Sequence, residues 1–359
     1  TYRKFSDFIQ PKSHYFNKYF YVMKNTIFFL LLFCISCTKQ KSDLLILPDE
    51  TPIKSIDYPN EIVMSYPLCI EIINNNLFLL MHKGEDVIKI VDTDNGSEIK
   101  HAGKFGSAPE EFIQPNYWGF DKNNNILIYD LMLKKLRKYN WEEIVNNTEL
   151  TIAKEIPLKS TNAHITSGKI LNDNCFVGSV PFGISEPLIV LDNNLSIIDS
   201  LGEVPDNNHK STNMTSYVGN IDTHNSKFVF VMASLGYIAC YQQQKGGSEL
   251  LWDHYIEKPV YKGDQLDRKQ LKLGFPDVKI TKNYIFCSYF GEVLSREKLK
   301  TLKPRNILVF DHKGNLLKNL RSERSVGRIA VSEDEKTLYT VTEEPEIAII
   351  RFDITNLLN

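Results

Sequence analysis

Short apolar runs separated by polar turns recur along most of the chain. Residues 115–140 show the unit most clearly, with an aromatic strand expected at 117–120, an Asn-rich turn at 121–125, and further strands at 126–130 and 136–140. Asn and Asp favour such turns because they tolerate a left-handed backbone and hydrogen-bond their own main chain. The apolar runs have the length and the Ile and Tyr content of strands, and no extended helical periodicity competes with them.

This unit occurs six times, at intervals of about 50 residues. A third strand follows the second in every copy, and four of the six third strands end in Asp. A fourth strand follows in five copies. The pattern predicts an all-β fold, a six-bladed β-propeller of four-stranded blades. The second strands are expected to begin near Leu77, Ile126, Phe176, Phe228, Ile285 and Leu338.

The sixth copy has no fourth strand of its own. An incomplete blade would expose an unpaired sheet edge, which promotes aggregation. We therefore expect a strand from the beginning of the chain to complete the last blade, with residues 53–58 as the best donor. The propeller is accordingly assigned to residues 53–359.

The segment before the propeller contains an export signal. Residues 23–37 begin with Met23 and Lys24, continue with a short apolar run at 27–33, and end in Ser36-Cys37. The apolar run is too short to span a membrane but suits a secretory signal. The Ser-Cys ending resembles a bacterial lipobox and predicts that Cys37 carries a lipid anchor to a membrane. The alternative for Cys34 and Cys37 is a redox or zinc pair.

The signal divides the rest of the N-terminal region. Residues 38–52 are interpreted as a tether, and residues 1–22 as upstream sequence that is not part of the natural protein. We expect an outer-membrane lipoprotein of the cell envelope, on the periplasmic face or on the cell surface.

Charge and motifs narrow the function. The 359 residues carry a net charge of −2, which gives no basic field for nucleic acid, so no nucleic-acid partner is expected. We find no nucleophile elbow, zinc-binding helix motif, phosphate-binding loop or dinucleotide motif. No catalytic residue, metal or cofactor is therefore predicted.

Candidate binding residues come from the loops that lead into the innermost strands, because these loops converge at one mouth of a propeller channel. Aromatic rings and an Arg suit a sugar, peptide or anionic ligand; the alternative is that these side chains pack between blades. The basic insertion at 292–306 is either a solvated loop or an anion-contacting lid. The candidates are Tyr117, Trp118, His164, Tyr217, Phe275 and Arg328.

Several stretches resemble known families. GSAPEEF at 106–112, with the run at 120–139, is similar to NHL-type propeller repeats. The stretches 283–293, 306–320 and 327–344 resemble the TolB-like six-bladed propeller lipoproteins of Bacteroidetes-type bacteria. The resemblance extends over about residues 66–353. It implies the fold and a lipoprotein, and it brings no catalytic residues.

Three functions agree with these observations. The first is a lipid-anchored, non-catalytic module that binds a glycan, a peptide or an envelope protein. The second is a propeller hydrolase or lyase with a central metal site, and the third is a purely structural scaffold. Fold alone does not separate them.

Lipidation at Cys37 has a direct test. Cells that express the chain are grown with a labelled fatty acid, and the wild type is compared with Cys37→Ser. We expect label in the wild type and none in the variant, because the thiol of Cys37 is the predicted acylation site. Equal labelling of both proteins would contradict the assignment.

Overall fold

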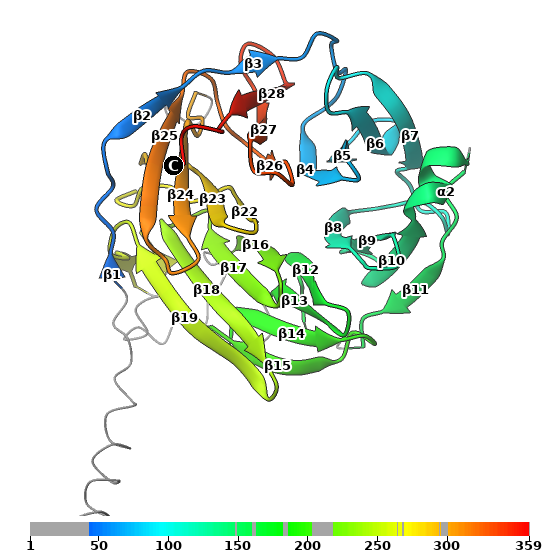
Figure 1. The fold of residues 1–359 in the computed structure, drawn as a ribbon. Helices are drawn as coiled ribbons and strands as arrows, with labels where there is room; N and C mark the ends of the chain where they lie inside the picture. Colours follow the sequence, from blue (N-terminus) through cyan, green and yellow to red (C-terminus); the bar gives the residue numbers. More distant parts are fainter. Residues whose placement is uncertain are drawn as a thin grey trace, which may run out of the picture. The chain divides into compact units, whose positions relative to one another are not determined.

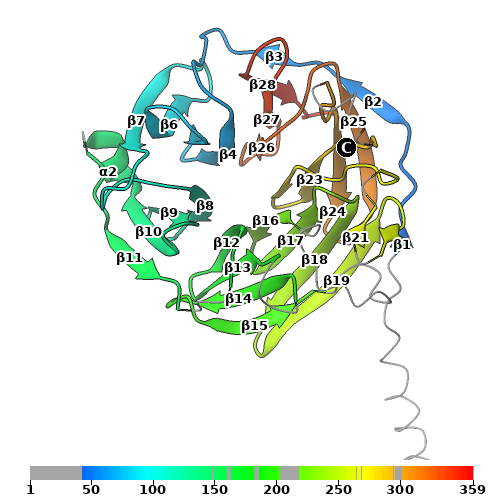
Figure 2. The same cartoon turned by 180° about the vertical axis from the view of Figure 1, so that it is seen from behind.

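Six sheets of mainly antiparallel strands are arranged as a ring in the computed structural model (Figure 1; Figure 2). The structure describes residues 43–147, 149–159, 163–181, 186–202, 218–263, 265–267, 269–293, 295 and 301–358. The predicted all-β, six-bladed propeller is confirmed. Each second strand begins within one residue of its predicted position.

The first three blades are each built from four consecutive strands. Blade 1 contains β4 (Pro67–Ile73), β5 (Asn76–Met81), β6 (Asp86–Asp92) and β7 (Glu98–Lys104). Blade 2 contains β8 (Pro115–Phe120), β9 (Asn125–Asp130), β10 (Lys135–Asn140) and β11 (Lys154–Pro157). Blade 3 contains β12 (Ser167–Asn172), β13 (Cys175–Ser179), β14 (Leu188–Asp192) and β15 (Ile197–Leu201).

The other three blades also include strands from the beginning of the chain. Blade 4 contains β16 (Gly219–His224), β17 (Lys227–Met232), β18 (Tyr237–Gln244) and β19 (Gly247–Tyr255), and adds β1 (Asp43–Leu44). Blade 5 contains β22 (Asp277–Ile280), β23 (Tyr284–Tyr289), β24 (Asn306–Asp311) and β25 (Leu316–Ser322), and adds β2 (Glu50–Ile53). Blade 6 contains β26 (Ile329–Val331), β27 (Thr337–Thr342), β28 (Ala348–Asp353) and β3 (Ile56–Asp57).

Turn chemistry explains the strand boundaries. The turns Asn74–Asn75 and Asn225–Ser226 have positive φ at both central residues, the geometry that matches the twist of a two-residue hairpin. The Asp that ends a third strand has a different task. The Asp192 carboxylate accepts hydrogen bonds from the backbone N–H groups of Asn194 and Ser196, at 2.9 and 2.8 Å. Asp311 holds the equivalent turn of blade 5.

The core lies between neighbouring blades. All residues of β5 and β9 except their first are buried. Phe78 of blade 1 packs against Tyr117 of blade 2, with ring centroids 5.3 Å apart. Burying one such side chain stabilises the fold by about 1.5–3 kcal/mol. Each blade therefore depends on both of its neighbours.

The beginning of the chain follows the outer edges of three blades (Figure 1). β1 pairs in parallel with β19, β2 pairs in parallel with β25, and β3 pairs antiparallel with β28 through Ile56 and Asp57. The described part of the predicted tether is thus bound to blades 4 and 5, which corrects that assignment. Pairing with the last blade is limited to the end of the predicted donor segment. A stabilising closure of the ring by this segment stays a prediction.

Two smaller differences from the expected fold concern loops. A short helix, α2 (Trp141–Asn146), buries Trp141 and Ile144 and begins at Asn140, whose side chain accepts from the backbone of Glu143 at 3.3 Å. A small hairpin, β20 (Tyr261–Lys262) and β21 (Gln265–Leu266), precedes blade 5. No helix in the described part of the chain is long and apolar enough to cross a membrane.

Deletion of the edge-binding segment tests its contribution to stability. Removing residues 38–60 should lower the melting temperature by about 5 °C or more, because the buried Ile53 and three strand pairings are lost. Removing only residues 38–47 keeps β2 and β3 and should cost less. Equal melting temperatures for the two deletions and the wild type would show that the segment does not hold the ring together.

Candidate functional site

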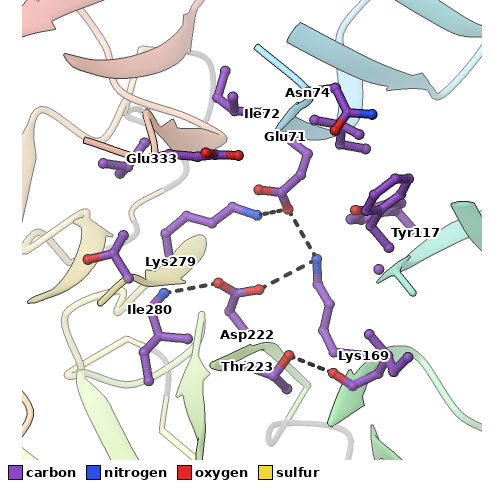
Figure 3. A pocket seen from close by; sticks show the side chains of 16 residues that line it. Glu71, Ile72, Asn74, Tyr117, Lys169, Asp222, Thr223, Lys279, Ile280 and Glu333 are labelled. Carbon is purple, nitrogen blue, oxygen red and sulfur yellow. Dashed lines mark hydrogen bonds and ion pairs between the residues drawn. The ribbon is translucent and has the colours of Figure 1, made fainter. Parts of the chain in front are cut away.

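The first strand of each blade lines a central channel, where charged side chains of alternating sign meet. Glu71 lies on β4, Lys169 on β12, Asp222 on β16 and Lys279 on β22, and all four point toward one another in Figure 3. Lys169, Asp222 and Lys279 are buried, and Glu71 is half-buried. Blade 2 contributes Tyr117 from β8 to the same space.

Strand alternation places these charges in the channel. Each of the four lies in a first strand, five or six residues before the second strand begins. Glu71, for example, stands between Ile70, which is fully buried in the core, and Ile72. Successive side chains of a strand point to opposite faces, so a charge between apolar residues turns away from the core and toward the axis.

The four charges are bound to one another unequally. Lys279 donates a hydrogen bond to Oε2 of Glu71. Oδ2 of Asp222 accepts from the backbone N–H of Ile280 at 2.9 Å. Nζ of Lys169 lies 3.6 Å from Oε2 of Glu71 and 3.6 Å from Oδ1 of Asp222, and 4.4 Å from the ring centroid of Tyr117. Lys169 is therefore held by charge and by the aromatic face, beyond hydrogen-bond range of either carboxylate.

Burial and the lysines act in opposite directions on the acids. Burial disfavours the ionised form of Glu71, but Lys279 and Lys169 outweigh it and lower the pKa of the carboxyl. For Asp222, burial outweighs the two lysines and raises the pKa. Burial works against the charge of Lys279, but Asp222 and Glu71 raise the pKa of its ammonium well above the usual value. Lys279 and Glu71 thus form a stable ion pair at neutral pH.

The channel opens into cavities at both ends. The larger has a volume of about 310 Å³ and lies where the first strands end; Asn74, Thr223, Thr281 and Glu333 line its rim. The cavity at the other end is about 40 Å³ and is lined by Asn116, Asn220, Asp277 and Arg328, among others. Cys69 lies in this narrow end, where burial raises the pKa of its thiol to about 11.

Two of the predicted binding residues line the channel. Tyr117 borders both cavities. Arg328 borders the narrow cavity, where Nη1 donates to the carbonyl of Pro276 at 2.9 Å and lies 3.7 Å from Oδ1 of Asp277. These residues are therefore placed where a ligand in the channel would meet them.

The other predicted residues lie elsewhere. Trp118 is fully buried between blades 2 and 3, stacked on Tyr129 with centroids 4.5 Å apart, and a Cβ on Gly168 would clash with its indole. Phe275 is fully buried against Tyr289. Both placements correct the expectation of a channel-facing ring. His164 is exposed beside a separate hollow of about 490 Å³, and Tyr217 lies outside the described residues.

The motif that resembles NHL repeats has a structural task. The backbone carbonyls of Pro109 and Glu111 accept hydrogen bonds from the buried guanidinium of Arg137, at 2.7 and 2.8 Å. The carboxylate of Glu111 accepts from the backbone N–H of Ala108 at 2.9 Å. The loop is thus fixed against blade 2.

Two basic residues in the described part of the insertion form ion pairs with blade 6. Lys303 pairs with Glu343, and Arg305 pairs with Glu344 at 2.6 Å. Arg296, Lys298 and Lys300 lie outside the described residues.

The sequence interpretation missed the charged cluster. It did not identify Glu71 and Asp222, which both reach the channel. The available signal was a charged residue at a similar place in four of the first strands. Within the described ranges, no three or more His, Cys, Asp or Glu side chains are grouped so that they could hold a metal ion.

Replacing Lys279 by Met should reveal the cost of removing the hydrogen-bonded partner of Glu71, which keeps the longer contact to Lys169. At pH 7 we expect a loss of about 2 kcal/mol in the free energy of unfolding, below the value for a dry site because the channel is open. The lowered pKa of Glu71 contributes stability above its usual value of 4.5, and this contribution is lost as the pH falls. The deficit should therefore shrink below that pH.

The control is Lys135→Met, because the pair between Lys135 and Glu155 on the outer part of blade 2 is partly exposed and contributes little. Chemical denaturation of both variants and the wild type at several pH values gives the comparison. A deficit for Lys279→Met that does not change with pH, or that equals the control's, would contradict the ion-pair account.

Comparisons with known proteins agree with this architecture. A family described as TolB-like 6-blade propeller-like matches residues 47–334. The streptogramin B lyase structure is similar over 83% of this chain and 97% of that one, with 12% identity and a TM-score of 0.52. Hydrazine synthase of Kuenenia stuttgartiensis is similar over 88% and 80%, with 12% identity and a TM-score of 0.47.

At 12% identity, the likeness to the lyase shows the fold alone. No curated protein matches the sequence significantly. The family match extends over most of the chain and ends before β27 and β28 of the sixth blade. The chain therefore belongs to the TolB-like six-bladed propeller family.

Proposed function

We propose that the chain is a lipid-anchored envelope protein whose propeller binds a ligand in the central channel and performs no chemistry on it. The observation that carries this proposal is the lining of the channel. Charged and polar side chains from the first strands surround a cavity of about 310 Å³. That volume accommodates about ten water molecules, or a small ligand.

The arrangement of charges supports binding over catalysis. A general acid or base needs a proton that it can exchange near neutral pH. Glu71 is paired with Lys279, and its pKa is lowered. The high pKa of the Cys69 thiol likewise leaves it protonated and weakly nucleophilic.

The alternative is a propeller enzyme, and Asp222 is the observation that favours it. Burial raises the pKa of this carboxyl, as is common for catalytic acids. The streptogramin B lyase shares the propeller fold. Turnover of a lactone, ester or glycan that is lost in Asp222→Asn would establish this alternative.

The envelope location rests on the sequence of residues 23–37. A short apolar run followed by Ser36-Cys37 supports export and lipidation. Bacteroidetes-type origin rests on the resemblance of the C-terminal stretches. The membrane is therefore the first proposed partner, through Cys37, and the channel ligand, a glycan, a peptide or part of an envelope protein, is the second.

Binding is tested with glycan and peptide arrays and with envelope extract, using variants at the two ends of the channel. Glu333→Ala alters the exposed rim of the large cavity, and Arg328→Ala alters the narrow end. We expect at least one of them to weaken the binding of an array ligand by about tenfold or more. Lys336→Ala is the matched control, since its side chain is exposed and pairs with Asp334 on the same turn.

Unchanged binding in both channel variants would place the interaction on the outer surface and contradict the proposal. Melting curves of the variants establish that the fold is retained.

A further inference from the structure

Lys169 differs from the other charged residues of the channel in the length of its contacts. Lys279 donates directly to Glu71, and Asp222 accepts from the main chain. An ammonium group has three N–H donors, and both carboxylates lie 3.6 Å from Nζ of Lys169. Together with Lys279, these contacts lower the pKa of Glu71 despite its burial, but they are longer than a hydrogen bond of ordinary length. A buried cation held at such distances can donate a shorter hydrogen bond to a ligand.

The position of this ammonium in the cavity is fixed before any ligand arrives. Nζ rests over the ring of Tyr117 at 4.4 Å from its centroid, and the two carboxylates attract it from the other side (Figure 3). The side chain is about 10% exposed, and it borders both the cavity of about 310 Å³ and the narrow one. A ligand therefore meets a cation that has little conformational freedom left to lose.

From this geometry we infer that the channel recognises its ligand through a single carboxylate group, which accepts hydrogen bonds from the ammonium of Lys169. This inference rests on the proposed ligand-binding function and names the chemistry of the same site. A hydrogen bond between an ammonium and a carboxylate is about twice as strong as one between neutral groups. A neutral ligand would therefore form a weaker hydrogen bond with Lys169.

The acids beside Lys169 select against more highly charged anions. A phosphate or sulfate bound to Lys169 would place its second charge near Glu71 and Asp222, which lie 3.6 Å from the same nitrogen. Like charges at such distances are costly in a partly buried site. A carboxylate carries a single negative charge, so it has no second charge for Glu71 and Asp222 to repel. Glu333 at the rim of the cavity adds to the discrimination.

The remainder of the ligand occupies the wide end of the channel. Asn74 and Thr223 supply polar groups there, and Phe120 supplies an aromatic one. Because of the cavity's volume, the ligand is either a small organic acid or the C-terminal end of a peptide. Both sources present the same carboxylate.

Saturation-transfer NMR with matched probes tests the inference. The probes are propionate, benzoate and glycyl-glycine, each beside its neutral amide, together with inorganic phosphate and sulfate at equal ionic strength. We expect at least one carboxylate to bind saturably, its amide to bind about tenfold more weakly, and phosphate and sulfate not to compete. Binding of glycyl-glycine alone would identify a peptide terminus, and binding of propionate or benzoate a small acid.

Two variants assign the effect to one ammonium. Lys169→Met should weaken carboxylate binding by about tenfold or more, whereas Lys135→Met on the outer part of blade 2 should leave it unchanged. Because Lys169→Met removes a buried charge, a second measurement keeps the native chain. Lysines are labelled biosynthetically with carbon-13 at Cε, and the Lys169 signal is assigned by its absence in Lys169→Arg. That signal should shift on addition of the carboxylate.

Three results would overturn the inference. They are equal binding of an amide and its carboxylate, competition by phosphate at similar concentration, and a Lys169 signal that does not move while the carboxylate binds. If a glycan from the arrays still depends on Glu333 or Arg328 in these cases, the binding function stands and only the carboxylate assignment fails. If no compound binds, both fail.

Discussion

Apolar faces that only a neighbouring blade can cover are the constraint on which this structure depends. The second strand of blade 1 buries every residue from Leu77 to Met81, and that of blade 5 every residue from Ile285 to Tyr289. Such a strand needs packing on both sides. Six sheets with this property satisfy it by closing into a ring, and each sheet then presents its first strand to a common axis.

The ring in turn determines the chemistry available at its centre. First strands from separate blades bring Glu71, Lys169, Asp222 and Lys279 together, although these residues are far apart in the sequence. Burying charges is costly unless they are paired, and the alternation of sign around the ring supplies the pairs. The pairing is incomplete at Lys169, whose ammonium stands 3.6 Å from both acids. The stability of the channel and its capacity to bind therefore come from the same four side chains.

The sequence was a good guide to features with local causes. Turns such as Asn74–Asn75 and the Asp192 cap are determined by residues a few positions apart, so the repeat and the strand boundaries could be predicted. The orientation of Trp118 could not, because its contacts with Phe176 and Gly168 depend on how blade 2 meets blade 3. The channel cluster is a similar case. The sequence around Lys169 does not show its partner, because only the closed ring places this residue beside Glu71.

The central claim is that the channel is a ligand site built around Lys169. A crystal structure of the protein purified from its native envelope, without added organic acids, tests this most directly. The account predicts electron density for a bound molecule in the wide end of the channel, with a carboxylate oxygen about 2.8 Å from Nζ of Lys169. Density in that space explained by water alone, with Lys169 turned to donate to Glu71 or Asp222, would contradict it.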